Sequence, residues 1–411
     1  MHHYIGVAAE FSKNCMELFY ANLRDQESRE AVGLFQSAII VLASYLDASA
    51  FISFGSVYEM HAWPPLRAID SKKILACPYE IHWLQHNMGP AFAYYFAFLP
   101  RPADGKDHTS CTDYECMATQ IDDANYRTKH MEPDCNCEFV GVAEDELVAI
   151  LISDKIPIVR FQSSNDSLIQ GKLQLIAAEP NTFYTAISHV WSDGLGNPHS
   201  NQLPTCQLQR LSSLVKDSNA DQHCTFWMDT LCVPATIREG RKVAIGKMRE
   251  TYSIANTVMV LDQGLQQSII DLDWWRETSD RHTTVELGYR LLASNWARRL
   301  WTLQEAAEAS RLIFRINNSF LDMRELRHRL QRTLWDFDSF SPLAKIIADK
   351  IRDNIRKPPS DFRGRWLRSV SWRQTSHEED EVVCLAALLN LRPEDFFQTP
   401  RRHKLLNFCA P

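Results

Sequence analysis

Cysteine and histidine side chains are concentrated in one short segment of the chain. Its six residues of these types are His108, Cys111, Cys116, His130, Cys135 and Cys137. Zinc prefers four sulfur or nitrogen ligands in a tetrahedron, and a polar segment with few apolar residues gains rigidity from such an ion. The segment therefore predicts a structural zinc ion bound by four ligands from Cys111, Cys116, His130, Cys135 and Cys137, with His108 as a further candidate.

The spacing of these residues does not decide which four bind the metal. Cys135 and Cys137 are separated by one residue, whereas the knuckles of zinc sites usually have two residues between the cysteines. The alternative interpretation is a set of independent buried thiols and a surface histidine. Four protein ligands leave no open position for water, so the predicted ion is structural rather than catalytic.

Three titratable residues close to tryptophans are the candidate catalytic groups: Glu305, Asp229 and His189. A carboxyl group beside indole rings loses hydration, which raises its pKa toward a value suited to acid or base catalysis. Structural ion pairs also shift pKa values. The alternative for Glu305 is therefore a structural pair with Arg298 or Arg299.

These candidates belong to three segments that join polar and aromatic residues to an apolar stretch, beginning at Tyr184, Thr225 and Asn295. In an open α/β sheet, ligands bind beyond the carboxyl ends of the strands. We therefore expect the three segments to converge around one hollow. The residues predicted to bind a small-molecule ligand there are Trp191, Asp193, Trp227, Arg299 and Trp301.

Short apolar runs alternate with helical stretches from Glu144 onward, which is typical of a parallel or mixed sheet with crossover helices. The predicted strands are 156–161, 172–177, 183–188, 225–228, 257–261 and 312–316. Two helices are expected at 9–24 and 31–46 from their apolar spacing. The predicted regions are a helical N-terminal region (1–107), a Cys/His-rich zinc-binding insertion (108–143), an α/β core (144–320) and a helical C-terminal cap (321–411).

Composition narrows the classes of partner. The chain has 44 Lys plus Arg against 51 Asp plus Glu, a formal net charge of −7, and it lacks the basic blocks that bind nucleic acid. Its longest apolar run, from Ala38, is far shorter than the roughly 20 residues of a membrane span. No signal peptide is recognised, so we expect a cytoplasmic protein. Phosphate-loop, dinucleotide and hydrolase-elbow motifs are missing, so no organic cofactor is predicted.

Four ordered motifs resemble landmarks of the fungal heterokaryon incompatibility (HET) domain. They are Ala186–Trp191, Trp227–Pro234, Val258–Leu261 and Arg299–Glu305. The Cys/His-rich segment and the segment that begins at Arg373 also resemble flanks of one HET subfamily. The resemblance implies a fold remotely similar to the Toll/interleukin-1 receptor (TIR) domain, and a role in non-self recognition and programmed cell death. A TIR-like NAD-cleaving site would use a carboxylate and an aromatic wall, which Glu305 with Trp191 or Trp227 would supply.

Two other functions stay open. If several aromatic residues line an apolar pocket of roughly several hundred Å³, the protein would suit a hydrophobic small molecule. It would then be a cofactor-independent enzyme of secondary metabolism, a cyclase or a pericyclase such as a Diels–Alderase, acting on a terpenoid or polyene by orienting a reactive conformer. The third hypothesis is a non-catalytic assembly module that self-associates through sheet edges or helices.

Overall fold

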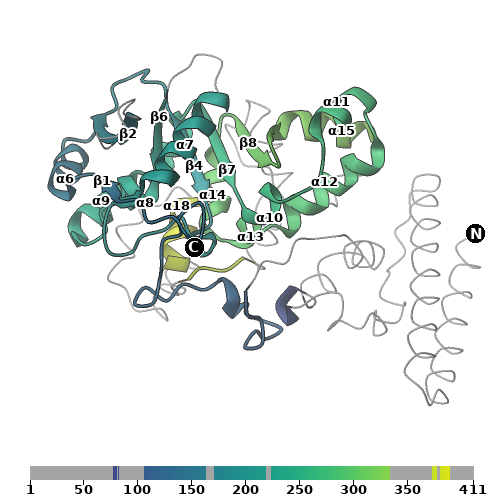
Figure 1. The fold of residues 1–411 in the computed structure, drawn as a ribbon, viewed down its shortest axis with the longest axis horizontal. Coiled ribbons are helices and arrows are strands. Elements are labelled where there is room, and N and C mark those ends of the chain that lie inside the picture. The colour runs from purple at the N-terminus through teal and green to yellow at the C-terminus, as the bar shows by residue number, and fades with distance from the viewer. Residues whose placement is uncertain are drawn as a thin grey trace, which may run out of the picture. The chain divides into compact units, whose positions relative to one another are not determined.

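The structure is a computed structural model of the chain (Figure 1). It describes residues 77–80, 82, 106–162, 171–218, 224–333, 373–376 and 380–388. The chain divides into two compact units, Met1–Ala118 and Thr119–Pro411. The helices predicted at 9–24 and 31–46 lie outside the described residues.

A seven-stranded mixed sheet forms the core of the second unit, in the order β3-β2-β6-β4-β7-β8-β9 (Figure 1). Its strands are β2 (Pro157–Gln162), β3 (Lys172–Ala177), β4 (Thr185–His189), β6 (Thr225–Met228), β7 (Thr257–Leu261), β8 (Leu312–Ile316) and β9 (Ser319–Asp322). β6, β4, β7 and β8 run parallel to one another, and β3, β2 and β9 join antiparallel. The predicted α/β class with a mixed sheet is confirmed.

The order of the parallel strands creates a crevice. In chain order they are β4, β6, β7 and β8, so the first strand lies between the second and the third. This is the strand order of flavodoxin-like sheets, in which the connections that follow the first and third strands run in opposite directions and open a crevice between the carboxyl ends of these two strands. The residues that follow β4 therefore lie at the edge of the sheet where the fold places ligands.

Complete burial explains why the central strands are recognisable in the sequence. Every residue of β4, β6 and β7 is buried, so apart from His189 at the end of β4 these strands have apolar or small residues throughout, without alternation. All six predicted strands are present within two residues of their predicted ends. The two short strands β1 (Phe139–Gly141) and β5 (Gln202–Pro204) form a separate antiparallel pair. These two and β9 are too short to show a periodic pattern.

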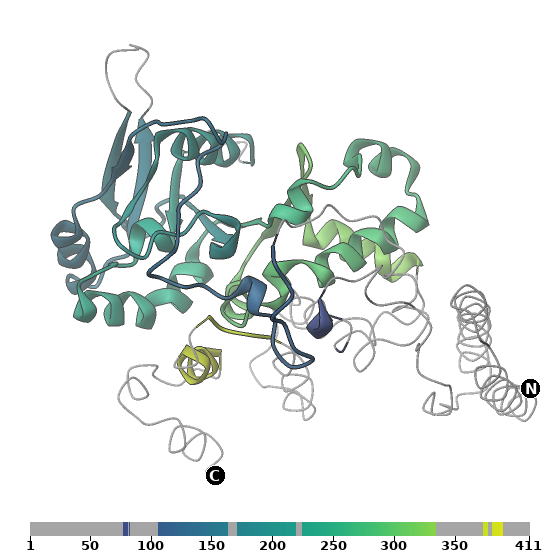
Figure 2. The same ribbon diagram turned by 60° about the horizontal axis from the view of Figure 1, so that its bottom comes forward.

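Helices flank the sheet (Figure 2). Their bounds are α6 (Glu144–Ile152), α7 (Thr205–Ser218), α8 (Asp229–Cys232), α9 (Arg238–Ile254), α10 (Gln263–Gln266), α11 (Leu272–Thr278), α12 (Arg281–Ala293), α13 (Asn295–Arg298), α14 (Trp301–Glu308), α15 (Met323–Thr333) and α18 (Asp380–Leu388). In α9 the stripe Ala244, Met248 and Tyr252 is buried, as its helical spacing predicts. Helix α14 packs against α9 and β4, and α18 packs against α14.

None of the described helices is long and apolar enough to cross a membrane.

Candidate functional site

A cavity of about 120 Å³ opens in the second unit beyond the carboxyl ends of β4 and β6. Side chains from all three predicted segments line it: His189, Trp191, Asp229, Arg299, Trp301 and Glu305. His189 ends β4, Asp229 follows β6, and α14 supplies Trp301 and Glu305, which lie four residues apart on one helix face. The structure thus brings Trp191, Asp229 and Glu305 around a common hollow.

Two residues predicted to bind the ligand lie elsewhere. Trp227 is buried in β6, where its ring packs edge-on against Tyr252 with the centroids 5.3 Å apart. The Asp193 carboxylate accepts a hydrogen bond of 2.9 Å from the Gln263 N–H. Neither side chain lines the cavity. Trp227 is therefore a packing residue, and Asp193 fastens its loop to the start of α10.

Glu305 is a buried carboxyl group held in a short relay. Its side chain accepts a hydrogen bond from the Ser188 hydroxyl, which itself accepts one of 2.5 Å from the Trp296 indole N–H. Burial, together with the nearby Asp229 charge, raises the pKa of Glu305 to about 7 against the opposing effects of Ser188 and His189. A carboxyl group with this pKa exchanges protons readily at neutral pH, which suits acid or base catalysis.

Asp229 is held as a carboxylate on the same cavity. Its oxygens lie 2.7 Å from His189 Nε2 and 2.8 Å from the Trp191 indole nitrogen, and it also accepts from the Thr230 N–H at 2.7 Å. Burial opposes ionisation, but His189 and these hydrogen bonds lower the pKa of Asp229 below its ordinary value. Two carboxyl groups with opposite pKa shifts are the pattern of sites that need both an acid or base and a fixed charge.

A segment from the C-terminal part of the chain closes one side of the cavity. The Arg299 guanidinium donates a hydrogen bond of 2.6 Å to Ser376, and the Trp301 indole N–H donates one of 3.3 Å to Asp380. Backbone pairing of Gln374 with Arg298 and Leu300 holds the segment in place. Helix α18, yellow in Figures 1 and 2, begins at Asp380 and lies beside α14.

The residues of the site that the sequence did not predict include Ser188, Trp296, Ser376 and Asp380. Ser188 and Trp296 lie within the predicted segments, but a serine and one more tryptophan carry no chemical signal of their own. Ser376 and Asp380 belong to the segment that begins at Arg373. This segment resembles a flank of one HET subfamily, which marks it as a possible part of the domain. Nothing in the sequence shows that it packs against α14.

A comparison with known families identifies the domain that holds the cavity. Residues 184–305 match the family described as Heterokaryon incompatibility protein (HET). The chain contains a HET domain. The matched range starts one residue before β4 and ends at Glu305, so it includes every predicted residue that lines the cavity. A search of curated proteins and a search of solved structures found no match.

The indole of Trp191 in the HET domain rests on a glycine, which gives a test of its placement. A Cβ added at Gly196 would lie 2.5 Å from Trp191 Cδ2. We expect Gly196→Ala to displace the indole from Asp229 and to lower the free energy of unfolding by about 1–3 kcal/mol, as overpacking does. Urea denaturation measures this difference.

Gly288→Ala is the matched control for that substitution. In helix α12 an added Cβ at Gly288 meets only Leu330, at 3.7 Å, which is ordinary contact. Alanine is also the better helix former, by up to about 1 kcal/mol. We expect Gly288→Ala to be neutral or stabilising. Equal unfolding curves for the two variants would contradict the tight packing of Trp191 on Gly196.

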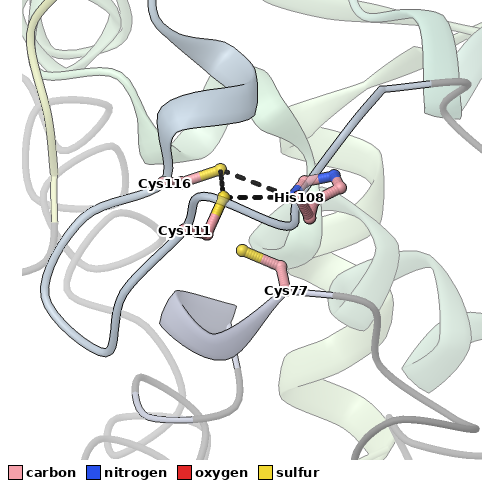
Figure 3. A group of neighbouring side chains, drawn as sticks. All are labelled: Cys77, His108, Cys111 and Cys116. Carbon is pink, nitrogen blue, oxygen red and sulfur yellow. Dashed lines mark hydrogen bonds between the residues drawn. The ribbon is translucent and has the colours of Figure 1, made fainter.

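Two groups of metal-ligating residues accompany the HET domain. The first quartet is Cys77, His108, Cys111 and Cys116, in the first unit, and the second quartet is His130, Cys135, Cys137 and Cys206, in the second unit. Within each quartet, one ligand atom from every residue lies within 4.8 Å of the others. Figure 3 shows the sulfur of Cys77 pointing toward those of Cys111 and Cys116. Each quartet could hold a metal ion.

The spacing of the donor atoms in the first quartet matches a tetrahedral zinc site. The sulfurs of Cys111 and Cys116 are 3.8 Å apart, and they lie 3.5 and 3.7 Å from Nδ1 of His108. Bond lengths to zinc in a tetrahedron imply separations of about 3.8 Å between two sulfurs and about 3.6 Å between sulfur and nitrogen. A disulfide would need about 2.05 Å between the sulfurs. The geometry therefore fits a shared ion rather than a covalent bond.

The sequence predicts six candidate ligands for one ion, and the structure divides them between the two quartets. His108, Cys111 and Cys116 join Cys77, and the remaining three join Cys206. Each of the six therefore belongs to a group that could hold a metal ion. Cys77 and Cys206 were missed because each lies more than 30 residues from its partners in the sequence, where spacing carries no information.

Proposed function

We propose that the HET domain binds NAD in the cavity and cleaves the bond between its nicotinamide ring and ribose. The observation that carries the proposal is that Glu305 and Asp229, two carboxyl groups whose pKa values are shifted in opposite directions, line the same cavity. Loss of cellular NAD would connect this chemistry to growth arrest and cell death in non-self recognition.

The proposed reaction consumes NAD and water and releases nicotinamide, ADP-ribose and a proton. As the glycosidic bond breaks, nicotinamide leaves with the electron pair as a neutral ring, and positive charge develops on the ribose. The Asp229 carboxylate stabilises that charge. Glu305 accepts the proton of the water that attacks the ribose carbon, as a general base.

The other lining groups suit the rest of such a ligand. Trp191 and Trp301 offer flat indole surfaces against which a nicotinamide or adenine ring can stack. The Arg299 guanidinium, which stays charged at neutral pH, provides donors for the diphosphate. These groups support the proposed binding of a charged dinucleotide, although a cavity of about 120 Å³ would enclose only part of it.

The charged lining argues against the cyclase hypothesis. Glu305, Asp229, Arg299, Arg241 and Asp380 all contribute to the wall of the cavity. A terpenoid or polyene offers these groups no hydrogen bonds, so its binding would leave them desolvated at a cost of several kcal/mol. Pockets for such ligands are predominantly apolar.

Incubation of the purified protein with NAD tests the proposal. We expect nicotinamide and ADP-ribose to accumulate in equal amounts, measured by chromatography with mass detection. Boiled protein should give neither product. Absence of both products after hours at high protein concentration would overturn the proposed activity.

We also propose that each quartet binds a structural zinc ion. Both donor sets consist of three cysteines and one histidine, a combination typical of closed tetrahedral zinc sites. The described cysteines form no disulfide, which agrees with a reducing compartment. We therefore propose a cytoplasmic location, where NAD is also available.

A further inference from the structure

We infer that the metal ion of the second quartet fixes the loop that carries Trp191 and so keeps the ligand cavity in its binding shape. The quartet thereby becomes a positioning site for the cavity, beyond its structural role. The inference rests on the proposed function for one of its two readouts, the affinity for NAD. The other readout, the motion of the loop, does not depend on NAD.

Residues 126–130, here called the strap, hold the loop of residues 191–196. The Tyr126 hydroxyl donates to the Trp191 carbonyl at 2.5 Å and accepts from the Gly196 N–H at 2.8 Å. The Thr128 hydroxyl donates to the Gly196 carbonyl at 2.6 Å. The Lys129 N–H donates to the Gly194 carbonyl at 2.8 Å. These contacts tie both ends and the middle of the loop to the strap.

The loop in turn sets the position of the Trp191 indole. Gly194 adopts a φ of 107°, a left-handed conformation that glycine tolerates and that turns the chain at the end of the short helix Trp191–Asp193. The loop then returns so that Gly196 lies beneath the indole. The indole N–H reaches Asp229 at 2.8 Å. Movement of the strap would therefore displace an aromatic wall of the cavity and a hydrogen-bond donor of its carboxylate.

The strap ends at a metal ligand. His130 is its last residue, and Cys206, the second residue of α7, lies on the other side of the same quartet. Residues 120–138 contain no helix or strand. Besides the quartet, Gln207 anchors the strap to α7 by donating to the Lys129 carbonyl at 3.1 Å. A metal ion would add bonds far stronger than this single amide contact.

The sulfur atoms of the second quartet have the neighbours that are typical of metal-bound thiolates. Nδ1 of His130 lies 3.3 Å from the Cys137 sulfur and 3.7 Å from the Cys206 sulfur, close to the roughly 3.6 Å expected around tetrahedral zinc. Backbone N–H groups of Met131 and Cys206 point at sulfur acceptors, each at 3.4 Å. Such outer hydrogen bonds orient metal ligands. Zinc is therefore the ion that this site fits.

Cys206→Ser tests the inference in the full chain, made both in the native background and with Glu305→Gln to prevent turnover. We expect bound zinc to fall by one equivalent, and amide hydrogen exchange in residues 191–197 to accelerate about tenfold. We expect NAD to bind about tenfold more weakly, in line with the loss of one or two hydrogen bonds. Cys224→Ser, which changes a cysteine outside both quartets, should alter none of these quantities.

Tyr126→Phe combined with Thr128→Val provides a test that keeps all four metal ligands. These changes remove the strap's hydroxyl contacts to the loop, so we expect zinc to stay bound while exchange in 191–197 accelerates as in Cys206→Ser. In a variant that combines these two changes with Cys206→Ser, the increases in exchange should not add, because both act through the same strap.

Two results would overturn the inference. One is that the Cys206→Ser protein keeps all of its zinc, and the other is that it loses zinc while amide hydrogen exchange in residues 191–197 stays unchanged. If Cys206→Ser does not fold, unchanged exchange in the strap variant would overturn it instead. If the unmodified protein binds no NAD, the proposed function fails, whereas faster exchange upon zinc loss still supports the coupling between the quartet and the loop.

Discussion

Glu305→Gln is expected to reduce the rate of NAD cleavage by about a thousandfold, within the range that a positioned acid or base contributes. The amide has nearly the same shape and its oxygen still accepts the Ser188 hydrogen bond, but it cannot take a proton from the attacking water. Initial rates of nicotinamide release measure the effect. Cleavage at an unchanged rate would remove Glu305 from the mechanism.

The same substitution is expected to stabilise the protein at high pH. The pKa of Glu305 is raised from 4.5 to about 7 in the folded state. Below pH 4.5 the carboxyl group is neutral in both states and folding is not penalised, but the free energy of unfolding decreases as the pH rises through 7, because the charged carboxylate is then buried. The full loss is about 3 kcal/mol. Since glutamine does not ionise, Glu305→Gln should be more stable than the unmodified protein at pH 8, by up to that amount, and nearly equal to it below about pH 4.

Glu308→Gln is the matched control for both measurements. Glu308 lies on the same helix, is partly exposed and pairs with Arg249 at 3.3 Å rather than lining the cavity. We expect near-normal cleavage and a difference in unfolding free energy within about 1 kcal/mol. A stability difference for Glu305→Gln that stays constant between pH 5 and 8 would contradict the burial of an ionisable group at this position.

Metal removal is expected to have the second large effect. We expect two equivalents of zinc in protein purified without added metal, one for each quartet. Cys111→Ser with Cys116→Ser should reduce this to one and unfold the chain around the first quartet. Structural zinc supplies about 10–16 kcal/mol of apparent binding free energy in small zinc-binding peptides, and residues 106–116 contain no helix or strand that would replace it.

Elemental analysis and limited proteolysis measure these outcomes. New cleavage between residues 106 and 118 should appear in the double variant, and Cys135→Ser with Cys137→Ser should remove the other equivalent. Cys224→Ser should keep both ions and the native cleavage pattern. Protein that is fully reduced, well folded and free of metal would contradict the zinc assignment.

The core of the sheet was predictable because burial acts on every residue of its strands. β4, β6 and β7 are covered on both faces, so apart from His189 at the end of β4 each is a continuous run of apolar or small residues. β1 and β5 have three residues each, too few for a pattern. Their pairing depends on contacts between distant parts of the chain, which local sequence does not encode.

The site was predictable only in part, for a related reason. The rule that parallel strands present ligands at their carboxyl ends located Asp229 and His189 correctly. Trp227 was misplaced because it lies inside β6 rather than beyond its end, so its side chain packs against Tyr252. Asp380 and Ser376 reach the cavity only because the chain returns to α14 through Gln374. Tertiary contacts of this kind have no signature in residue spacing.

The central claim is that one cavity gathers Trp191, Asp229, Arg299 and Glu305 around a nicotinamide nucleotide. A crystal structure of the Glu305→Gln protein soaked with NAD tests it most directly. The account predicts density for the dinucleotide in the cavity, with the ribose of nicotinamide riboside beside residues 229 and 305 and an indole against one of its rings. Density at another surface, or an empty cavity at millimolar NAD, would contradict the account.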